Sequence, residues 1–125
     1  MLAADTVVAV GRRILPKAET EAEAKACLKL LSGRTHRVLT GVAVIAPDGR
    51  MGKRLNESRV TFKRMTAEET ATYLASGEWQ GKAGGYGIQG RAGGLVSEIT
   101  GSYSSIVGLP LYETLALLTG LGYRP

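Results

Sequence analysis

The glycine-rich stretch at residues 82–91, Lys-Ala-Gly-Gly-Tyr-Gly-Ile-Gln-Gly-Arg, constrains the fold of this chain more than any other segment. Nearly half of the chain's 17 glycines lie in and around it, at positions 77, 81, 84, 85, 87, 90, 93 and 94. Glycine loses more backbone entropy on ordering than any other residue, so this density predicts turns with positive φ or a close approach between the backbone and a ligand. Lys82 and Arg91 flank the stretch, and Gln89 is its only long uncharged polar side chain. We therefore predict a pocket wall that offers backbone N–H groups, positive charge and one amide to a phosphorylated ligand with a hydrogen-bonding base.

This stretch has three alternative interpretations. Residues 85–90 satisfy the pattern G-x-G-x-x-G, but a dinucleotide site needs a strand before the pattern and a helix opening on its last glycine. Glycines lie on both sides instead, at residues 77–81 and 93–94, so neither flank fits. A P-loop is excluded because no G-K-[ST] sequence is present. A mobile surface loop is the remaining alternative on composition alone.

Composition narrows the class of protein. A chain of 125 residues with 44% hydrophobic and 22% charged residues is typical of one soluble globular domain. No apolar run approaches the roughly 20 residues of a membrane helix, and no secretory signal is visible. A single cysteine fits a reducing compartment such as the cytoplasm, and a lone histidine, His36, excludes a multi-histidine zinc site.

The net charge of +5 permits nucleic-acid binding. The basic residues are dispersed, however, and the aromatic residues, at 6%, do not interleave with them as a stacking platform would require. A general attraction for polyphosphate anions explains the charge equally well, so nucleic acid is an unlikely partner.

Four blocks of sequence resemble the Maf family of nucleotide pyrophosphatases, also described as septum-formation-inhibitor-like proteins. They are residues 4–8, 30–36, 82–91 and 101–110, in the family's order. The resemblance implies an α/β fold of the Maf/inosine-triphosphatase type, with a mixed central sheet flanked by helices. It also implies hydrolysis of nucleoside triphosphates to a monophosphate and pyrophosphate. Threonine after the aspartate, with glutamine in Y-G-I-Q-G, is similar to the branch that acts on dTTP and UTP.

The resemblance assigns roles to five residues. Asp5 matches the acidic residue of the A-D-T motif, thought to accept a proton from water or to hold Mg²⁺ or Mn²⁺. Lys17 and Lys82 would neutralise phosphate charge, although Lys17 stands in Pro-Lys-Ala where the family usually has Gly-Lys-Pro. Thr6 and Gln89 would read the base. From the residues alone, an alternative stays open for two of these residues. Asp5 could lie at an exposed end of a strand, and Lys17 could lie in a solvated loop.

Hydrophobic periodicity predicts the remaining elements. Residues 2–10 are expected to form a buried strand, residues 34–46 a second strand and residues around 57–63 a third, with a turn at 47–49. Capping boxes predict helices that open at Thr20 and Thr66, and the first should bury Cys27. A strand at 95–99 and a last helix after Pro110 should follow, with Leu111, Leu115 and Leu118 as that helix's core stripe.

Two further polar residues have ambiguous roles. Glu57 resembles an acidic family position that could help to hold a metal, and a cross-strand ion pair is at least as good an explanation. His36 is expected to pack or cap at a strand start, with no partner that would make it a general base.

The family's N-terminal S-x-S-P-R-R motif has no match, so residues 1–125 look like a single Maf-like domain corresponding to the C-terminal portion of the family fold. A nucleoside triphosphate pyrophosphatase is the leading hypothesis. The alternative is a catalytically impaired nucleotide-binding module, or a regulator of cell division by septum formation. An exposed strand edge would favour a homodimer.

Overall fold

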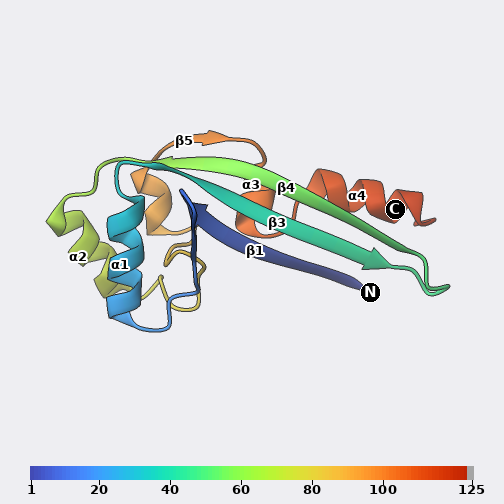
Figure 1. Cartoon of the computed structure of the whole chain (residues 1–125), viewed down its shortest axis with the longest axis horizontal. Helices are drawn as coiled ribbons and strands as arrows, with labels where there is room; N and C mark the ends of the chain where they lie inside the picture. Colours follow the sequence, from blue (N-terminus) through green and yellow to red (C-terminus); the bar gives the residue numbers. More distant parts are fainter. Residues whose placement is uncertain (124–125) are drawn as a thin grey trace.

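A computed structural model describes residues 1–123, which form a five-stranded sheet in the order β2-β1-β3-β4-β5. The strands are β1 (Leu2–Val10), β2 (Arg13–Leu15), β3 (Thr35–Ile45), β4 (Met51–Phe62) and β5 (Val96–Thr100). Figure 1 shows β1, β3 and β4 as three long neighbouring ribbons, with α1 (Glu21–Leu31) and α2 (Ala67–Ser76) at one end of them. The predicted α/β class is confirmed. The prediction of a mixed sheet is wrong, because all four strand pairings in residues 1–123 are antiparallel. The chain reverses its direction between each pair of neighbouring strands.

Strands β3 and β4 form where strands were predicted, although β4 begins earlier than expected, at Met51, and the alternation predicted for residues 57–63 is confirmed. On β3 every second residue from His36 to Val44 is buried, and on β4 Ser58, Val60 and Phe62 are buried between exposed or half-buried neighbours. Successive side chains of a strand point to opposite faces, so this pattern presents one packed face and one wetter face. Helices cover the packed face.

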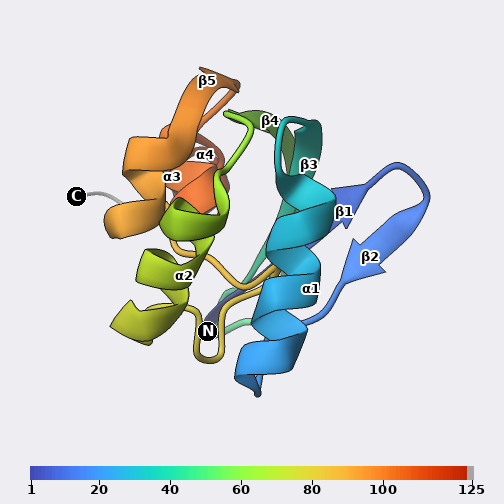
Figure 2. The ribbon, with the colours of Figure 1, turned by 90° about the vertical axis from the view of Figure 1, so that its left-hand side faces the viewer.

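The helices α1 and α2 lie side by side at one end of the sheet, as Figure 2 shows. Both begin with the predicted capping boxes, in which Thr20 pairs with Glu23 and Thr66 with Glu69. Each box satisfies backbone donors that the first helical turn leaves unpaired. Gly77 ends α2 in the left-handed conformation, with φ of 74°.

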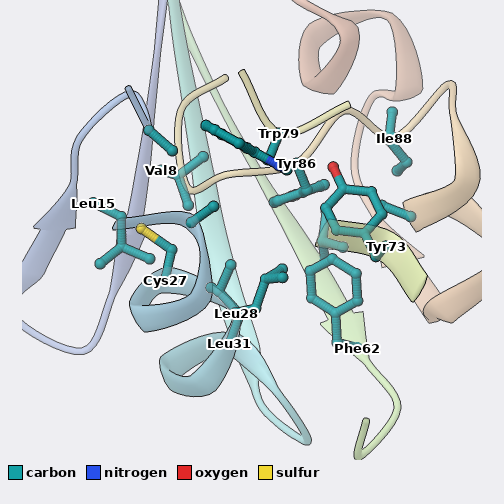
Figure 3. Close-up of a cluster of buried hydrophobic side chains, with 14 of the residues drawn as sticks. Val8, Leu15, Cys27, Leu28, Leu31, Phe62, Tyr73, Trp79, Tyr86 and Ile88 are labelled. Carbon is teal, nitrogen blue, oxygen red and sulfur yellow. The ribbon is translucent and has the colours of Figure 1, made fainter. Parts of the chain in front are cut away.

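The main hydrophobic core lies between these two helices, the sheet and the glycine-rich segment (Figure 3). Cys27, Leu28 and Leu31 from α1 meet Phe62 from β4 and Tyr86 from the glycine-rich segment. Cys27 is buried as predicted, and burial, followed by the nearby charge of Glu23, raises the pKa of its thiol. This core fixes the position of the glycine-rich segment against the sheet.

The C-terminal helices differ from expectation. A short helix that the sequence did not indicate, α3 (Tyr103–Val107), precedes α4 (Leu111–Gly120). The predicted core stripe of α4 is wrong in part: Leu111 and Leu115 are exposed, and Leu118 is partly buried. Instead, Thr114 and Leu117 face the sheet, and Leu117 packs on Val42 and Val44 of β3. The helix is apolar on several sides, so periodicity alone does not decide which side meets the sheet. Within residues 1–123, no helix is both long and apolar enough to cross a membrane.

The first half of β1 has one open edge. Strand β2 pairs only with Val8–Val10, so residues 2–7 pair with β3 alone. Met1 and Ile45 exchange backbone hydrogen bonds of 2.7 Å in both directions, which places the backbone groups of Leu2, Ala4 and Thr6 on the side away from β3. Residues 2–10 form the predicted strand, but residues 2–5 are exposed rather than buried.

Candidate active site

A cavity of about 540 Å³ lies between β1, the glycine-rich segment and the end of α3. All five residues assigned from the sequence line it: Asp5, Thr6, Lys17, Lys82 and Gln89. They come from three separate stretches of the chain, so the fold assembles what the sequence only suggested. The rest of the wall includes apolar side chains, among them those of Val8, Val38, Ile88 and Ile106.

The glycine-rich segment is tied down by backbone hydrogen bonds to residues 16–18. The N–H of Ala18 donates to Lys82 O at 3.0 Å, the N–H of Gly81 donates to Ala18 O at 2.8 Å, and the N–H of Gly84 donates to Pro16 O at 3.1 Å. Gly81, Gly84 and Gly85 have φ values between 70° and 77°, as predicted for turns that only glycine adopts readily. The mobile-loop alternative is therefore not supported, and the same bonds hold Lys17 beside Lys82.

The predicted supply of free backbone N–H groups is wrong for residues 82, 84, 85, 90 and 91, whose N–H groups donate within the protein, and it stays a prediction for the cavity-lining residues 83, 86, 88 and 89. The N–H groups of residues 81, 82, 84, 85, 90 and 93 all donate to carbonyls of the protein itself. The glycines serve instead for tight turns and close packing. A Cβ at Gly85 would lie 3.3 Å from Ala24 Cα, and one at Gly93 would lie 2.5 Å from Ile88 O. Charge in the cavity therefore comes from side chains.

Glu78 holds the turn that carries Gln89 in place, a role that the sequence did not predict. Its Oε1 accepts the backbone N–H of Arg91 at 3.1 Å, and its Oε2 lies 3.3 Å from Arg91 Nε. The carboxylate passes so close to Gly90 that a Cβ there would lie 1.9 Å from Oε1. The partners are thirteen positions apart in the sequence, so no local spacing could have indicated this contact.

Asp5 lies at the rim of the cavity. Strand alternation sends its side chain away from the face that carries Thr6 and Val8, and its Oδ1 bends back to accept the N–H of Thr6 at 3.0 Å. That N–H is on the open edge of β1, so the carboxylate lies across the edge. Asp5 also lines a shallow hollow on the opposite face of the sheet, with Gly41 and Lys53. The carboxylate is exposed to water and can reach the cavity mouth.

Thr6 belongs to a short hydrogen-bonded chain that runs into the protein. Its Oγ1 lies 3.0 Å from Oγ1 of Thr40, the residue directly opposite it on β3. The Thr40 hydroxyl in turn donates to Ser105 O of α3 at 2.8 Å. Thr40 and Ser105 are fully buried, whereas Thr6 is half-buried and lines the cavity.

The two lysines give the cavity its positive charge. Neither Lys17 nor Lys82 forms an ion pair with an acidic residue of the described part of the chain, and the stem of Lys82 passes 3.6 Å from the position of a Cβ on Gly87. Two unpaired ammonium groups beside one cavity attract a multiply charged anion. Glu78 is the other acidic residue of the wall, and Arg91 neutralises it.

His36 is buried and does not line the cavity, but it contacts Tyr86, which does. Its Nε2 is 2.5 Å from the Tyr86 hydroxyl, and its ring stacks on Phe62. Burial lowers the pKa of His36 to about 4 and raises the pKa of Tyr86, so both rings are neutral near pH 7. The prediction that His36 packs at a strand start is confirmed. Its bond to Tyr86 ties β3 to the glycine-rich segment.

Glu57 lies outside the cavity. Its side chain is on β4, with Oε1 4.0 Å from Arg37 Nη1 of β3, and both side chains are partly exposed. This is the cross-strand ion pair that the sequence left open as the alternative to a metal ligand.

The oxygen donors at the cavity fit a divalent cation only where a ligand shares it. Within residues 1–123, no group of three or more His, Cys, Asp or Glu residues could hold a metal ion. Mg²⁺ usually retains water and binds through one or two carboxylates together with substrate phosphates. Asp5 keeps Oδ2 without a partner in the described part of the chain, so it fits a cation shared with a phosphorylated ligand. An all-protein metal cage does not fit.

The sequence of this chain is similar to those of known proteins. The family of Maf-like proteins matches residues 1–121. A protein named dTTP/UTP pyrophosphatase from Caulobacter vibrioides is 70% identical over 125 residues, covering 100% of this chain and 65% of the relative. Proteins of the same name from Maricaulis maris and Granulibacter bethesdensis are 66% and 65% identical, covering 98% and 99% of this chain and 59% and 58% of the relatives. The chain thus spans 58% to 65% of the length of these relatives, and it belongs to the Maf family.

Proposed function

We propose that this chain carries the nucleotide site of a nucleoside triphosphate pyrophosphatase that acts on dTTP and UTP. The observation that carries the proposal is the convergence of Asp5, Thr6, Lys17, Lys82 and Gln89 on one cavity. The names of relatives at 65% to 70% identity support the same substrates. The cavity volume of about 540 Å³ falls within the usual range for a small-molecule site.

In the proposed reaction, Lys17 and Lys82 bind the triphosphate and draw negative charge off the leaving group. Asp5 accepts a proton from a water molecule, whose oxygen forms a bond to the α-phosphorus. The bond between the α-phosphorus and the bridging oxygen breaks, and pyrophosphate leaves with that oxygen. Gln89 and Thr6 orient the base. Preorganised positive groups of this kind stabilise the charge that develops on phosphoryl oxygens.

We propose Mg²⁺ or Mn²⁺ as the cofactor, held by Asp5 together with the phosphates of the substrate. When bound, such an ion would neutralise the charge of the leaving pyrophosphate.

The test is incubation of the 125-residue chain with UTP or dTTP and Mg²⁺, with separation of products by chromatography. Uridine monophosphate and pyrophosphate are expected. Asp5→Asn should lower turnover by roughly 10²–10⁴-fold, the usual contribution of a general base, and leave the thermal midpoint unchanged. Asp48→Asn is the matched control, because Asp48 is an exposed carboxylate in the turn between β3 and β4. Full activity of Asp5→Asn would remove Asp5 from the mechanism. Tight UTP binding without product would favour the impaired nucleotide-binding module.

We further propose that residues 1–125 act as one domain in the cytoplasm, and that two copies associate through the open edge of β1. Unpaired backbone groups on an edge strand favour pairing with another strand. Sedimentation equilibrium should find a dimer at micromolar concentration, and Ala4→Pro should weaken it by removing one edge N–H that faces away from β3. A monomeric wild-type chain at that concentration would reject the dimer.

A further inference from the structure

The hydroxyl protons of the chain Thr6–Thr40–Ser105 can be placed by counting donors. A threonine hydroxyl has one proton to donate and two lone pairs to accept with. The Thr40 hydroxyl lies 2.8 Å from Ser105 O, and a carbonyl oxygen can only accept, so Thr40 donates there. The 3.0 Å contact between the two threonine hydroxyls must then be a donation from Thr6 to Thr40.

The inner end of this chain is rigid. Thr40 is 0% exposed, so no water competes for its proton. Ser105 O also accepts the N–H of Gly108 at 3.1 Å, which leaves its second lone pair for Thr40. Threonine is stiff at χ1 because it is β-branched, and Thr40 lies in the middle of a regular strand. The direction of the Thr40 hydroxyl is therefore set by the fold.

The pairing of β1 and β3 makes the outer contact equally specific. Odd-numbered residues of β1 exchange backbone bonds with β3, so Thr6 and Thr40 form a non-hydrogen-bonded pair, in which side chains approach most closely. Cross-strand threonine pairs of this kind form hydroxyl hydrogen bonds. With its proton committed to Thr40, the Thr6 hydroxyl offers only lone pairs to the cavity.

We propose that Thr40 is a positioning residue that makes Thr6 an obligate hydrogen-bond acceptor, so that the cavity selects a pyrimidine with an N3–H group over one with a bare N3. This inference rests on the proposed nucleotide site. Uracil and thymine carry a proton on N3, which Thr6 can accept, whereas cytosine presents a lone pair to the lone pairs of Thr6. Gln89 cannot make this distinction alone, because its amide carries both a donor and an acceptor and can turn over.

The test is calorimetric binding of the non-hydrolysable α,β-methylene analogues of UTP and CTP to the full 125-residue chain. Wild type should prefer the uridine analogue by at least about tenfold, the effect of one mismatched, partly buried hydrogen bond. Thr40→Ser keeps the hydroxyl and should keep the preference. Thr40→Val frees the Thr6 proton to turn toward cytosine N3, and the preference should fall below about threefold, as an estimate from the same hydrogen-bond cost.

Thr40→Val also removes a buried bond to α3, so its fold is checked by circular dichroism. A second measurement does not depend on that variant: the N3-methyl derivative of the uridine analogue, which lacks the N–H, should bind wild type at least about tenfold more weakly. Equal binding of uridine and cytidine analogues by wild type, an unchanged preference in folded Thr40→Val, or full affinity for the N3-methyl derivative would overturn the proposal.

The outcomes separate this proposal from the proposed enzymatic activity. A uridine preference that depends on Thr40, found in a chain that releases no pyrophosphate from UTP, would support the role of Thr40 and reject the hydrolysis. Hydrolysis of UTP and CTP at equal efficiency, with equal binding of their analogues, would support the activity and overturn the role of Thr40. If neither analogue binds, both proposals fail.

Discussion

Three glycines around Gln89 provide a graded test of how tightly the cavity wall is built. Gly90, Gly93 and Gly94 all lack the positive φ that would make alanine strained, so the space around each one decides the cost of a Cβ. A Cβ at Gly90 would meet the end of the Glu78 side chain at 1.9 Å, and one at Gly93 would meet the backbone carbonyl of Ile88 at 2.5 Å. At Gly94 nothing lies within 4 Å.

The expected costs follow from what must move. Gly94→Ala should stabilise the protein by about 0.5 kcal/mol, because alanine reduces the entropy of the unfolded chain. Gly90→Ala should cost about 1 kcal/mol, because Glu78 can swing away but loses its bond to the Arg91 N–H and a largely exposed ion pair. Gly93→Ala should cost about 2–3 kcal/mol, because rigid backbone must shift to relieve the overlap.

Thermal unfolding followed by circular dichroism measures the order. For a chain of this size, 1 kcal/mol corresponds to roughly 4 °C in Tm, so Gly90→Ala should lower Tm by about 4 °C and Gly93→Ala by about 10 °C. Gly90→Ala should also weaken binding of the uridine analogue, because the released clamp no longer fixes the turn beside Gln89. If Gly93→Ala unfolds at the same temperature as Gly94→Ala, the segment is not packed as described and the mobile-loop interpretation returns.

Two further predictions concern the core. Burial lowers the pKa of His36 to about 4 from an ordinary value near 6.5, so stability is full above pH 6.5 and is lost as the pH falls toward 4; about 2 kcal/mol should be gone at pH 5. Urea unfolding at pH 7 and pH 5 measures the loss, and His36→Gln should flatten it. On α4, Leu117→Ala should cost about 2–4 kcal/mol and Leu115→Ala less than about 0.5 kcal/mol in the same assay, because only Leu117 is buried against β3. Equal costs would restore the original assignment of the helix face.

The elements that were predicted correctly are those set by local chemistry. Capping boxes place the starts of α1 and α2 because a side chain three residues away satisfies the first backbone donors. Period-two burial at the end of β4 was predicted from residues 57–63 because one face of the sheet is packed there. Asp5, Thr6, Lys82 and Gln89 were identified through two of the four ordered blocks and Lys17 through a separate match, and all five line one cavity.

What the sequence could not predict depends on contacts between distant segments. The Glu78 clamp on Arg91 joins two sides of a loop, and the bond from Thr40 to Ser105 joins β3 to α3 across 65 residues. The face that α4 turns to the sheet was misassigned for the same reason. Leucines lie on several sides of that helix, and the position of Val42 and Val44 decides which of them is buried.

The glycine-rich segment shows how these two levels combine. Its composition indicated a wall of free backbone donors, but the N–H groups of residues 82, 84, 85, 90 and 91 bond to the protein itself, in the segment's own turns, to Pro16 and to Glu78. The backbone of this wall is fixed, and it holds Lys82 and Gln89 at the cavity. A β-bridge between Lys17 and Ala83 places Lys17 beside them. We expect selectivity to come from a few side chains whose hydrogen-bonding direction is fixed by neighbouring residues. Glu78 constrains the turn that carries Gln89, and Thr40 constrains the hydroxyl of Thr6. The residues that decide what this cavity accepts are therefore expected to include Glu78 and Thr40, neither of which any of the recognised motifs contains.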